Sequence, residues 1–262
     1  MTNMRASLAI FAGTLADAAR AETLKWAAGL DQVEDKNQGG AFDPVTVADK
    51  AAEQAMRRMI ETRFPDHAIS GEEFADRPGA SPYCWSLDPI DGTRAFVCGL
   101  PSWVTLIALL EDGRPVLGLI DAPRLDERYV GFGESAHLLT PGGAVSIAAS
   151  GCGRIADARL STTDPYLFDA AEREHFDRLR HGARLTRYGW DGYAYARLAA
   201  GSLDLVVESG LKPHDHNALV PLVRAAGGAV ANWQGGADLS SGRIVAAASR
   251  SLLEEACTLL NS

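Results

Sequence analysis

The feature that most constrains the fold is a series of apolar segments separated by short turns in the first half of the chain. Two apolar runs, Trp103–Leu110 and Val116–Ile120, flank the dipeptide Asp112-Gly113. Asp-Gly is favoured in two-residue hairpin turns, where both turn residues need a positive φ. Further segments of this kind are residues 83–87, 129–132 and 145–148. We therefore predict a long antiparallel meander rather than a chain of β-α-β units.

Helical spacing dominates the sequence before this meander. Residues 3–29 place apolar side chains such as Leu8, Phe11 and Leu15 on one face, which predicts an amphipathic helix. A second helix is expected to begin near Thr46, with Asp49 in its first turn.

Strands and helices alternate in the second half. The expected helices cover residues 166–180, 193–200 and 215–226, and the last of these contains Pro221, which can kink it. Ser251, followed by Glu254, has the pattern of a capping box that opens a final helix. The expected strands are residues 159–162, 184–187, 203–208 and 244–248.

Length and composition restrict the class of protein. The 262 residues suit one large domain or two packed halves, and a cluster of Gly and Pro near residues 140–155 suggests halves at 1–145 and 146–262. No apolar run is long enough to span a bilayer and the first residues lack a signal-peptide pattern, so we expect a cytoplasmic protein. The four cysteines show no metal-ligand spacing, and the net charge of −9 disfavours binding to nucleic acid.

Carboxylates occur in four short segments that are hard to explain as surface. They are Asp49 in a helix start, Glu72 after an apolar stretch, the segment Asp88-Pro-Ile-Asp91-Gly-Thr93, and Asp215 before an apolar helix. Alone, each is commonly a helix cap or a solvated turn, but their combination is much more specific. Mg²⁺ prefers oxygen ligands and retains waters and substrate oxygens in its shell. An acidic protein that binds an anionic substrate also needs local positive charge, which metal ions can supply.

These motifs resemble those of the inositol monophosphatase superfamily, in order and spacing from Asp49 to Gly228. The resemblance implies an α/β fold with five layers, αβαβα, in which a large antiparallel sheet precedes a smaller sheet. It also implies a magnesium-dependent phosphomonoesterase, usually a homodimer, that acts on a small phosphate ester.

The resemblance also assigns roles to particular residues. The first metal would be held by Glu72, Asp88 and the Ile90 carbonyl, and the second by Asp88, Asp91 and Asp215. Two or three Mg²⁺ ions per site are implied, with Mn²⁺ as an alternative. Two metals about 3.5–4 Å apart can clamp a phosphate and activate a water as nucleophile.

Further roles concern the water and the phosphate. Thr93, paired with Asp49, would orient or deprotonate the attacking water, with help from Glu72. Gly92 and Thr93 would offer backbone N–H groups to the phosphate, beside Asp91 and Asp215. None of the six histidines is needed, although His214 and His216 flank Asp215, and position 214 usually carries an aromatic residue in the family.

Within the superfamily the chain resembles the histidinol-phosphatase branch most. The resemblance is carried by the segments Asp88–Pro101, Gly113–Pro123, Leu125–Arg128, Tyr188–Tyr195 and Glu208–Pro213. Histidinol phosphate carries an ammonium and an imidazole beyond its phosphate, so a selective pocket should offer carboxylates away from the metals. Asp191 and Glu208 fit that need, whereas the other reading makes Asp191 a helix cap and Glu208 a surface group. Arg187 is a weaker candidate for a contact with the substrate or across a dimer.

Two other functions remain open. A phosphatase acting mainly on inositol phosphate, or on many small esters, would share the metals and differ at the rim of the pocket. A non-catalytic binding protein on the same fold would be expected to lack a metal carboxylate or Thr93, and all of these are present.

Overall fold

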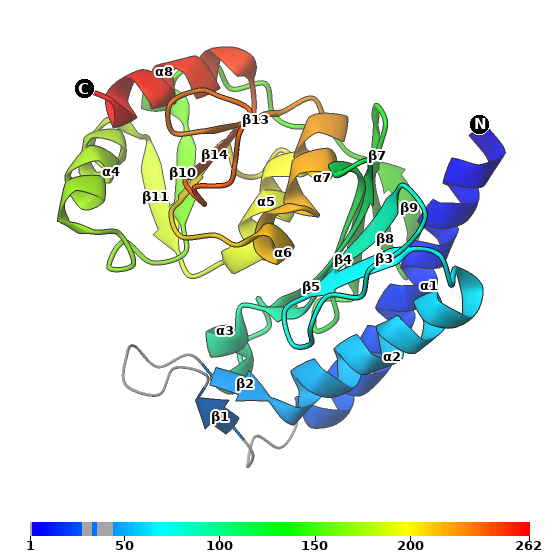
Figure 1. Ribbon diagram of the computed structural model, residues 1–262. Coiled ribbons are helices and arrows are strands. Elements are labelled where there is room, and N and C mark those ends of the chain that lie inside the picture. Colours follow the sequence, from blue (N-terminus) through cyan, green and yellow to red (C-terminus); the bar gives the residue numbers. More distant parts are fainter. Residues whose placement is uncertain (1, 28–32, 36–43) are drawn as a thin grey trace.

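Two β-sheets, of seven and five strands, alternate with three layers of helices in the computed structural model, which describes residues 2–27, 33–35 and 44–262 (Figure 1). From one side of the molecule to the other, the layers are a helix pair, a large sheet, a middle helix layer, a small sheet and a second helix pair. The predicted αβαβα fold class is therefore confirmed.

The large sheet has seven strands in the order β3-β4-β5-β6-β7-β8-β9. All neighbours are antiparallel except β3 and β4, so the predicted meander is confirmed from β4 onward. Asp112 and Gly113 join β5 to β6 with φ values of 50° and 74°, as an Asp-Gly hairpin requires. The strands are β3 Ala68–Gly71, β4 Tyr83–Asp91, β5 Val104–Glu111, β6 Arg114–Ala122, β7 Glu127–Phe132, β8 Ser135–Thr140 and β9 Gly143–Ser146.

Helices α1 (Thr2–Trp26) and α2 (Val47–Arg63) cover the outer face of this sheet (Figure 1). Leu15 of α1 and Met56 of α2 are fully buried in one cluster with Trp85 of β4. Burial of each such side chain contributes about 1.5–3 kcal/mol, which fixes both helices to the sheet. Residues 28–29, which the sequence adds to the first helix, lie outside the described residues.

The small sheet has five strands in the order β11-β10-β12-β14-β13. Helices α4 (Ala170–Gly182) and α8 (Arg250–Leu260) cover its outer face, around Phe176 and Leu252. The strands are β10 Arg159–Thr162, β11 Leu185–Tyr188, β12 Leu205–Glu208, β13 Ala229–Asn232 and β14 Ile244–Ala247. Smaller elements are β1 Val33–Asp35, β2 Pro44–Thr46, α3 Thr93–Val97 and the 3₁₀ turn η1 Ile155–Asp157.

The middle layer consists of α5 (Asp191–Ala199), α6 (Pro213–His216) and α7 (Leu219–Ala225), which pack against both sheets. Close approach to the large sheet depends on Gly118 of β6, because a Cβ there would lie only 1.9 Å from the Ala218 carbonyl oxygen. The division into halves at 145/146 falls inside β9, and one core joins both sheets, so that division stays a prediction.

Two predictions about helices were wrong. The helix expected over 215–226 is broken into α6 and α7, because Pro221 has no N–H to donate to the carbonyl of Asn217 four residues earlier. The final helix is capped by Ser249, not Ser251: Ser249 has an extended backbone, and its Oγ accepts a hydrogen bond from the Leu252 N–H at 3.2 Å. Ser251 already lies inside the helix.

Candidate active site

A bulge at the end of β4 places two aspartates on the same side of the large sheet. Residues three apart on a regular strand point to opposite faces. Asp88 pairs with Leu106 of β5, whereas Asp91 pairs with Val104, so β4 carries one extra residue between them. Pro89 lies in the bulge, and the Thr105 hydroxyl donates to its carbonyl at 2.7 Å. Such bulges re-aim side chains, and here one brings both carboxylates to the inner face.

The junction between α6 and α7 brings in the third carboxylate. The Asn217 amide donates to the Ser86 hydroxyl of β4 at 3.1 Å, and both side chains are buried. This contact holds the short helix α6, and with it Asp215, against β4. Carboxylate oxygens of Asp88, Asp91 and Asp215 consequently lie within 4.8 Å of one another.

The electrostatics of these three residues are unfavourable without a cation. Asp88 is 1% exposed, and its Oδ1 has no hydrogen-bond partner among the described residues. Burial and then the charges of Glu72, Asp91, Asp215 and Asp49 raise the pKa of Asp88 well above its usual range. A hard divalent cation would reverse these effects, since it provides a partner for the unpaired oxygen and neutralises the carboxylates. The residues present therefore fit a Mg²⁺ site.

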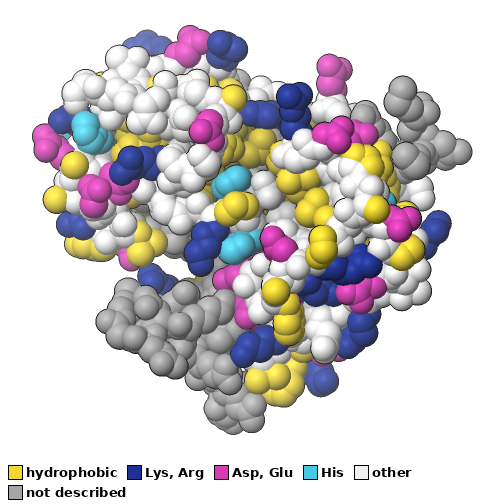
Figure 2. All heavy atoms as spheres, viewed as in Figure 1, with side chains coloured by type: hydrophobic (Ala, Val, Ile, Leu, Met, Phe, Trp, Pro, Cys, Tyr) yellow, Lys and Arg dark blue, Asp and Glu magenta, His cyan; other side chains and the backbone are white. Residues whose placement is uncertain are grey.

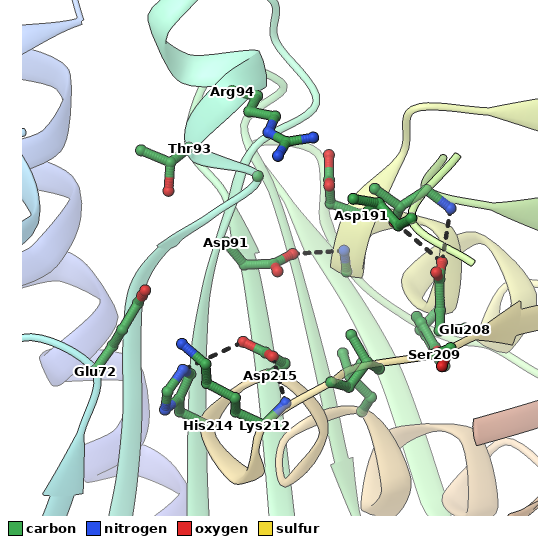
Figure 3. Close-up of a pocket in the computed structure, with 17 residues that line it drawn as sticks. Glu72, Asp91, Thr93, Arg94, Asp191, Glu208, Ser209, Lys212, His214 and Asp215 are labelled. Atoms are coloured by element: carbon green, nitrogen blue, oxygen red, sulfur yellow. Dashed lines mark hydrogen bonds and ion pairs between the residues drawn. The ribbon is translucent and has the colours of Figure 1, made fainter. Parts of the chain in front are cut away.

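The cluster opens into a cavity of about 240 Å³ (Figure 3). Asp91 and Asp215 point into its centre, Glu72 approaches from one side and Glu208 lies at the other. In Figure 2, histidine, acidic and basic side chains gather at the middle of the molecule, near α6. The lining residues are Glu72, Asp91, Gly92, Thr93, Arg94, Thr163, Leu167, Asp191, Gly192, Tyr195, Glu208, Ser209, Leu211, Lys212, His214, Asp215 and Leu219.

Glu72 is held in place from α2. The fully buried Glu53 carboxylate accepts the Glu73 N–H at 2.8 Å and the Arg57 Nε at 2.7 Å. Gly71 packs directly against this carboxylate, where a Cβ would lie 2.1 Å from Glu53 Oε1. The Gly71-Glu72-Glu73 segment is therefore fixed at the end of β3, and Glu72 reaches the cavity.

Asp49 and Thr93 come from elements on either side of β4 in the chain, α2 and α3. Asp49, in the first turn of α2, is 1% exposed and close enough to raise the pKa of Asp88. The Thr93 hydroxyl donates to the Ile90 carbonyl at 3.0 Å, which leaves that oxygen one lone pair for another partner. The predicted pairing of Thr93 with Asp49 stays a prediction.

Asp91 and Asp215 are oriented by helix starts. The N–H of Gly192, at the start of α5, donates to Asp91 Oδ2 at 2.5 Å, and the Lys212 N–H donates to Asp215 Oδ2 at 2.6 Å. His214 Nε2 lies 3.4 Å from Asp215 Oδ1. His214 thus lines the cavity beside Asp215, whereas burial lowers the pKa of the neighbouring His216 to about 4 and keeps its ring neutral.

Two more carboxylates, Asp191 and Glu208, line the same cavity. Glu208, at the end of β12, is 4% exposed and accepts hydrogen bonds from both the N–H and the hydroxyl of Thr163, and from the Thr162 hydroxyl. Burial raises the pKa of Glu208 to about 8. Burial also raises the pKa of Asp191 to about 6, against the nearby charge of Arg94, and Asp191 has a φ of 45°. A non-glycine residue with this φ is strained, and such strain is common at functional sites.

The alternative interpretations made Asp191 a helix cap and Glu208 a surface group, and the structure gives the position of each. Asp191 is the first residue of α5, whose N-cap is Trp190, and Glu208 is buried rather than on the surface. Arg187 lies on β11, an exposed edge strand of the small sheet, and is not among the residues that line the cavity.

Several lining residues were not anticipated from the sequence. Arg94 and Lys212 supply positive charge at the cavity, and Tyr195 projects from α5. Thr163 follows β10, which runs parallel to β12, so both strands end at the same edge of the sheet. That shared edge was the signal that could have linked Thr163 to Glu208.

Comparison with known proteins agrees with this geometry. The model of the inositol monophosphatase family matches residues 4–262. The chain is 45% identical over 196 residues to a chloroplastic bifunctional phosphatase of Arabidopsis thaliana, covering 74% of this chain and 56% of that protein, so it spans little more than half of that relative. It is 35% identical over 253 residues to a histidinol-phosphatase of Streptomyces coelicolor, covering 91% of each chain.

The structure is similar to that of an inositol monophosphatase from Zymomonas mobilis, with a TM-score of 0.84, 39% sequence identity and coverage of 98% of each chain. The five-layered fold and the carboxylate cluster at the end of β4 agree with these comparisons. The chain belongs to the inositol monophosphatase family. Among the described helices, none is long and apolar enough to cross a membrane.

Proposed function

We propose that the protein hydrolyses L-histidinol phosphate to L-histidinol and phosphate with the help of Mg²⁺. The observation that carries this proposal is a pair of carboxylates that line the cavity in addition to the aspartate cluster, the half-buried Asp191 and the buried Glu208. They suit a substrate that carries cationic groups beyond its phosphate. The likeness to bacterial histidinol-phosphatases supports the same substrate.

In this proposal the metal ligands are Glu72, Asp88, the Ile90 carbonyl, Asp91 and Asp215. Bound Mg²⁺ would neutralise these carboxylates and polarise the phosphate. Thr93 and Asp49 orient the attacking water, and Glu72 helps to accept its proton. Gly92 and Thr93 bind phosphate oxygens through their N–H groups, and no side chain becomes phosphorylated.

A second candidate is an inositol monophosphatase or a phosphatase of broad specificity. It is favoured by the similarity to the Zymomonas mobilis enzyme along nearly the whole chain. The two candidates share the cluster and differ at the rim, where inositol phosphate offers hydroxyl groups and no positive charge. A non-catalytic role is disfavoured, because all the carboxylates of the cluster are in place.

A substrate panel tests the proposal. Phosphate release from L-histidinol phosphate and from inositol 1-phosphate is measured at equal concentrations, with Mg²⁺, with Mn²⁺ and with a chelator. We expect histidinol phosphate to be hydrolysed at least tenfold faster, and activity to disappear with the chelator. Equal rates, or faster release from inositol phosphate, would contradict the proposed substrate, and activity in the chelator would contradict the metal site.

The remaining expectations are proposals of the same kind. They are a homodimer, a cytoplasmic location and the acceptance of Mn²⁺. A contact between subunits is supported by Leu100, Tyr166 and Tyr188, exposed side chains that line one groove beside the cavity. Arg187 precedes Tyr188 on β11, where it could take part in such a contact.

A further inference from the structure

Helix α5 carries two tyrosines whose hydroxyl groups have opposite surroundings. The Tyr193 hydroxyl donates to Glu127 Oε2 at 2.8 Å, and the Tyr129 hydroxyl donates to the same oxygen at 2.6 Å. The Tyr195 side chain is 2% exposed, and among the described residues its hydroxyl has no hydrogen-bond partner. Tyr193 is therefore satisfied within the fold, whereas Tyr195 is not.

The position of Tyr195 on α5 directs it toward the site. It follows Gly192 by three residues, so both lie on one face of the helix. That face meets the aspartate cluster, since the Gly192 N–H donates to Asp91. Tyr195 lines the cavity. Burial and the nearby carboxylates of Glu208, Asp91 and Asp215 raise the pKa of its hydroxyl.

An unpaired buried hydroxyl is unfavourable for the fold, because burial removes its hydrogen bonds to water. A ligand group in the cavity would restore the lost bond. The carboxylates around this hydroxyl favour a positively charged donor, for which the phenolic oxygen is an acceptor. The ligand group is thus expected to be an ammonium.

The location also restricts where the ammonium sits in the substrate. The phosphate has to lie at the aspartate cluster, and the space beside Tyr195 is next to that cluster. In the phosphate ester of a 1,2-amino alcohol, two carbon atoms separate the nitrogen from the ester oxygen. Such an ammonium stays close to the phosphate and can reach the Tyr195 oxygen and the Glu208 carboxylate together.

We propose that Tyr195 is a specificity-determining residue, whose hydroxyl oxygen accepts a hydrogen bond from an ammonium on the carbon next to the phosphate-bearing carbon. This inference rests on the proposed function and extends it to the class of 1,2-amino alcohol phosphates. Glu208 binds the same ammonium from the other side. The imidazole of the substrate makes no contact with Tyr195 in this arrangement.

The experiment compares Tyr195→Phe with Tyr193→Phe, a matched loss of one hydroxyl from the same helix. The substrates are L-histidinol phosphate and its analogue without the amine, 3-(imidazol-4-yl)propyl phosphate. The ratio of their kcat/KM values is expected to fall about tenfold in Tyr195→Phe, mainly through KM, and to stay unchanged in Tyr193→Phe. Thermal unfolding of the metal-free proteins should show Tyr195→Phe at least as stable as wild type, and Tyr193→Phe less stable.

Several results would overturn the inference. If the ratio of the two kcat/KM values in Tyr195→Phe is within twofold of the wild-type ratio, the hydroxyl does not contribute to recognition of the amine. A lower Mg²⁺ affinity with an unchanged ratio shows that the hydroxyl serves the metal site instead. In both cases the preference of the wild type for histidinol phosphate over inositol phosphate still stands. If the wild type lacks that preference, the proposed function fails, and the inference fails with it.

Discussion

Asp88 occupies a position that is costly for a carboxylate and valuable for a ligand. It is almost completely buried, one of its oxygens is unpaired among the described residues, and other acidic groups surround it. An apolar residue there would pack with less penalty. A carboxylate at this place is what a cation site requires.

Asp88→Asn is expected to reduce phosphate release more than a hundredfold while the fold stays intact. An amide keeps the shape of the side chain but loses the charge that holds the metals. Without metal the variant should be as stable as wild type or more so, because one of several repelling charges has been removed. Activity assays and thermal unfolding, both with and without Mg²⁺, check these outcomes. Activity within about tenfold of wild type would contradict the metal-ligand role.

The residues of the candidate site differ in how well the sequence predicts them. Glu72, Asp88, Asp91 and Asp215 belong to short motifs whose residue types have few structural uses together. Tyr195 belongs to no such pattern. A tyrosine at helical spacing looks the same in the sequence whether its hydroxyl is hydrogen-bonded, as in Tyr193, or buried without a partner among the described residues, as in Tyr195. That difference depends on tertiary neighbours such as Glu127, and the local sequence does not contain it.

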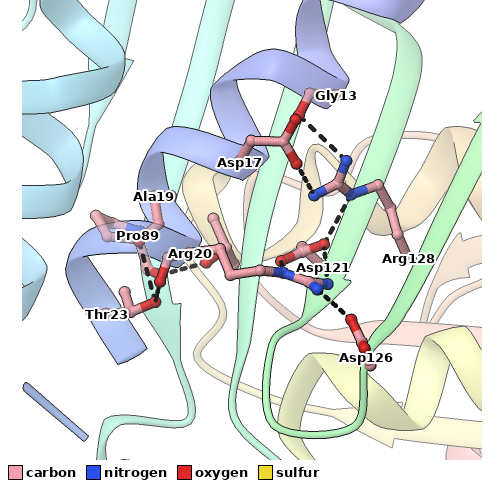
Figure 4. A network of polar contacts seen from close by, with 10 residues as sticks. Gly13, Asp17, Ala19, Arg20, Thr23, Pro89, Asp121, Asp126 and Arg128 are labelled. Carbon is pink, nitrogen blue, oxygen red and sulfur yellow. Dashed lines mark hydrogen bonds and ion pairs between the residues drawn. The ribbon is translucent and has the colours of Figure 1, made fainter. Parts of the chain in front are cut away.

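Among the elements, α1 is attached to the large sheet through buried charge as well as apolar packing (Figure 4). Asp121 of β6 is fully buried and accepts hydrogen bonds from Arg20 of α1 and from Arg128 of β7. Arg128 also reaches back to Asp17 of α1, at 2.7 Å. The network thus joins the helix to two neighbouring strands.

Asp121→Asn is expected to destabilise the protein by about 3–5 kcal/mol, because it leaves two arginines without their shared buried partner. Denaturation by urea provides the measurement. The matched control is Glu254→Gln, which breaks a solvent-exposed pair with Arg250 one turn away on α8 and should change stability by less than about 0.5 kcal/mol. Equal effects of the two substitutions would show that the buried network does not anchor α1.

Elements defined by local chemistry are those that the sequence predicts well. The hairpin at Asp112-Gly113 depends on two residues, and the structure has it as expected. The break before α7 and the N-cap at Ser249 also follow local rules. For α7, helical spacing of apolar residues favoured one long helix while Pro221 favoured a break, and for α8 either of two nearby serines could have been the N-cap. The strands β3, β8 and β13 were missed, because they have no clear apolar alternation of their own and acquire their identity from pairing with other strands.

At the scale of the molecule, folding encloses acidic groups that repel one another. The pKa of Glu208 rises from an ordinary 4.5 to about 8 in the folded protein, so the folded state keeps a proton that the unfolded state loses above pH 4.5. The contribution of this group to the free energy of unfolding is therefore fully present below pH 4.5, and it is lost as the pH rises toward 8.

Glu208→Gln should remove this dependence from the metal-free protein. Relative to wild type, its free energy of unfolding is expected to increase with pH between about 5 and 8, by up to about 1.4 kcal/mol per pH unit. Urea denaturation in chelator at several pH values measures the difference, with Glu254→Gln as a control that should show no trend. A difference that stays constant over this range would contradict a protonated Glu208.

The shared middle layer has a consequence for the order in which the protein matures. Asp88 and Asp91 come from the large sheet, whereas Asp215 arrives only with α6, after most of the second half has been synthesised. A nascent chain that has completed its first sheet cannot yet close the cluster. Cation binding, which favours only molecules with the full site, would then select finished molecules over partly folded ones by mass action.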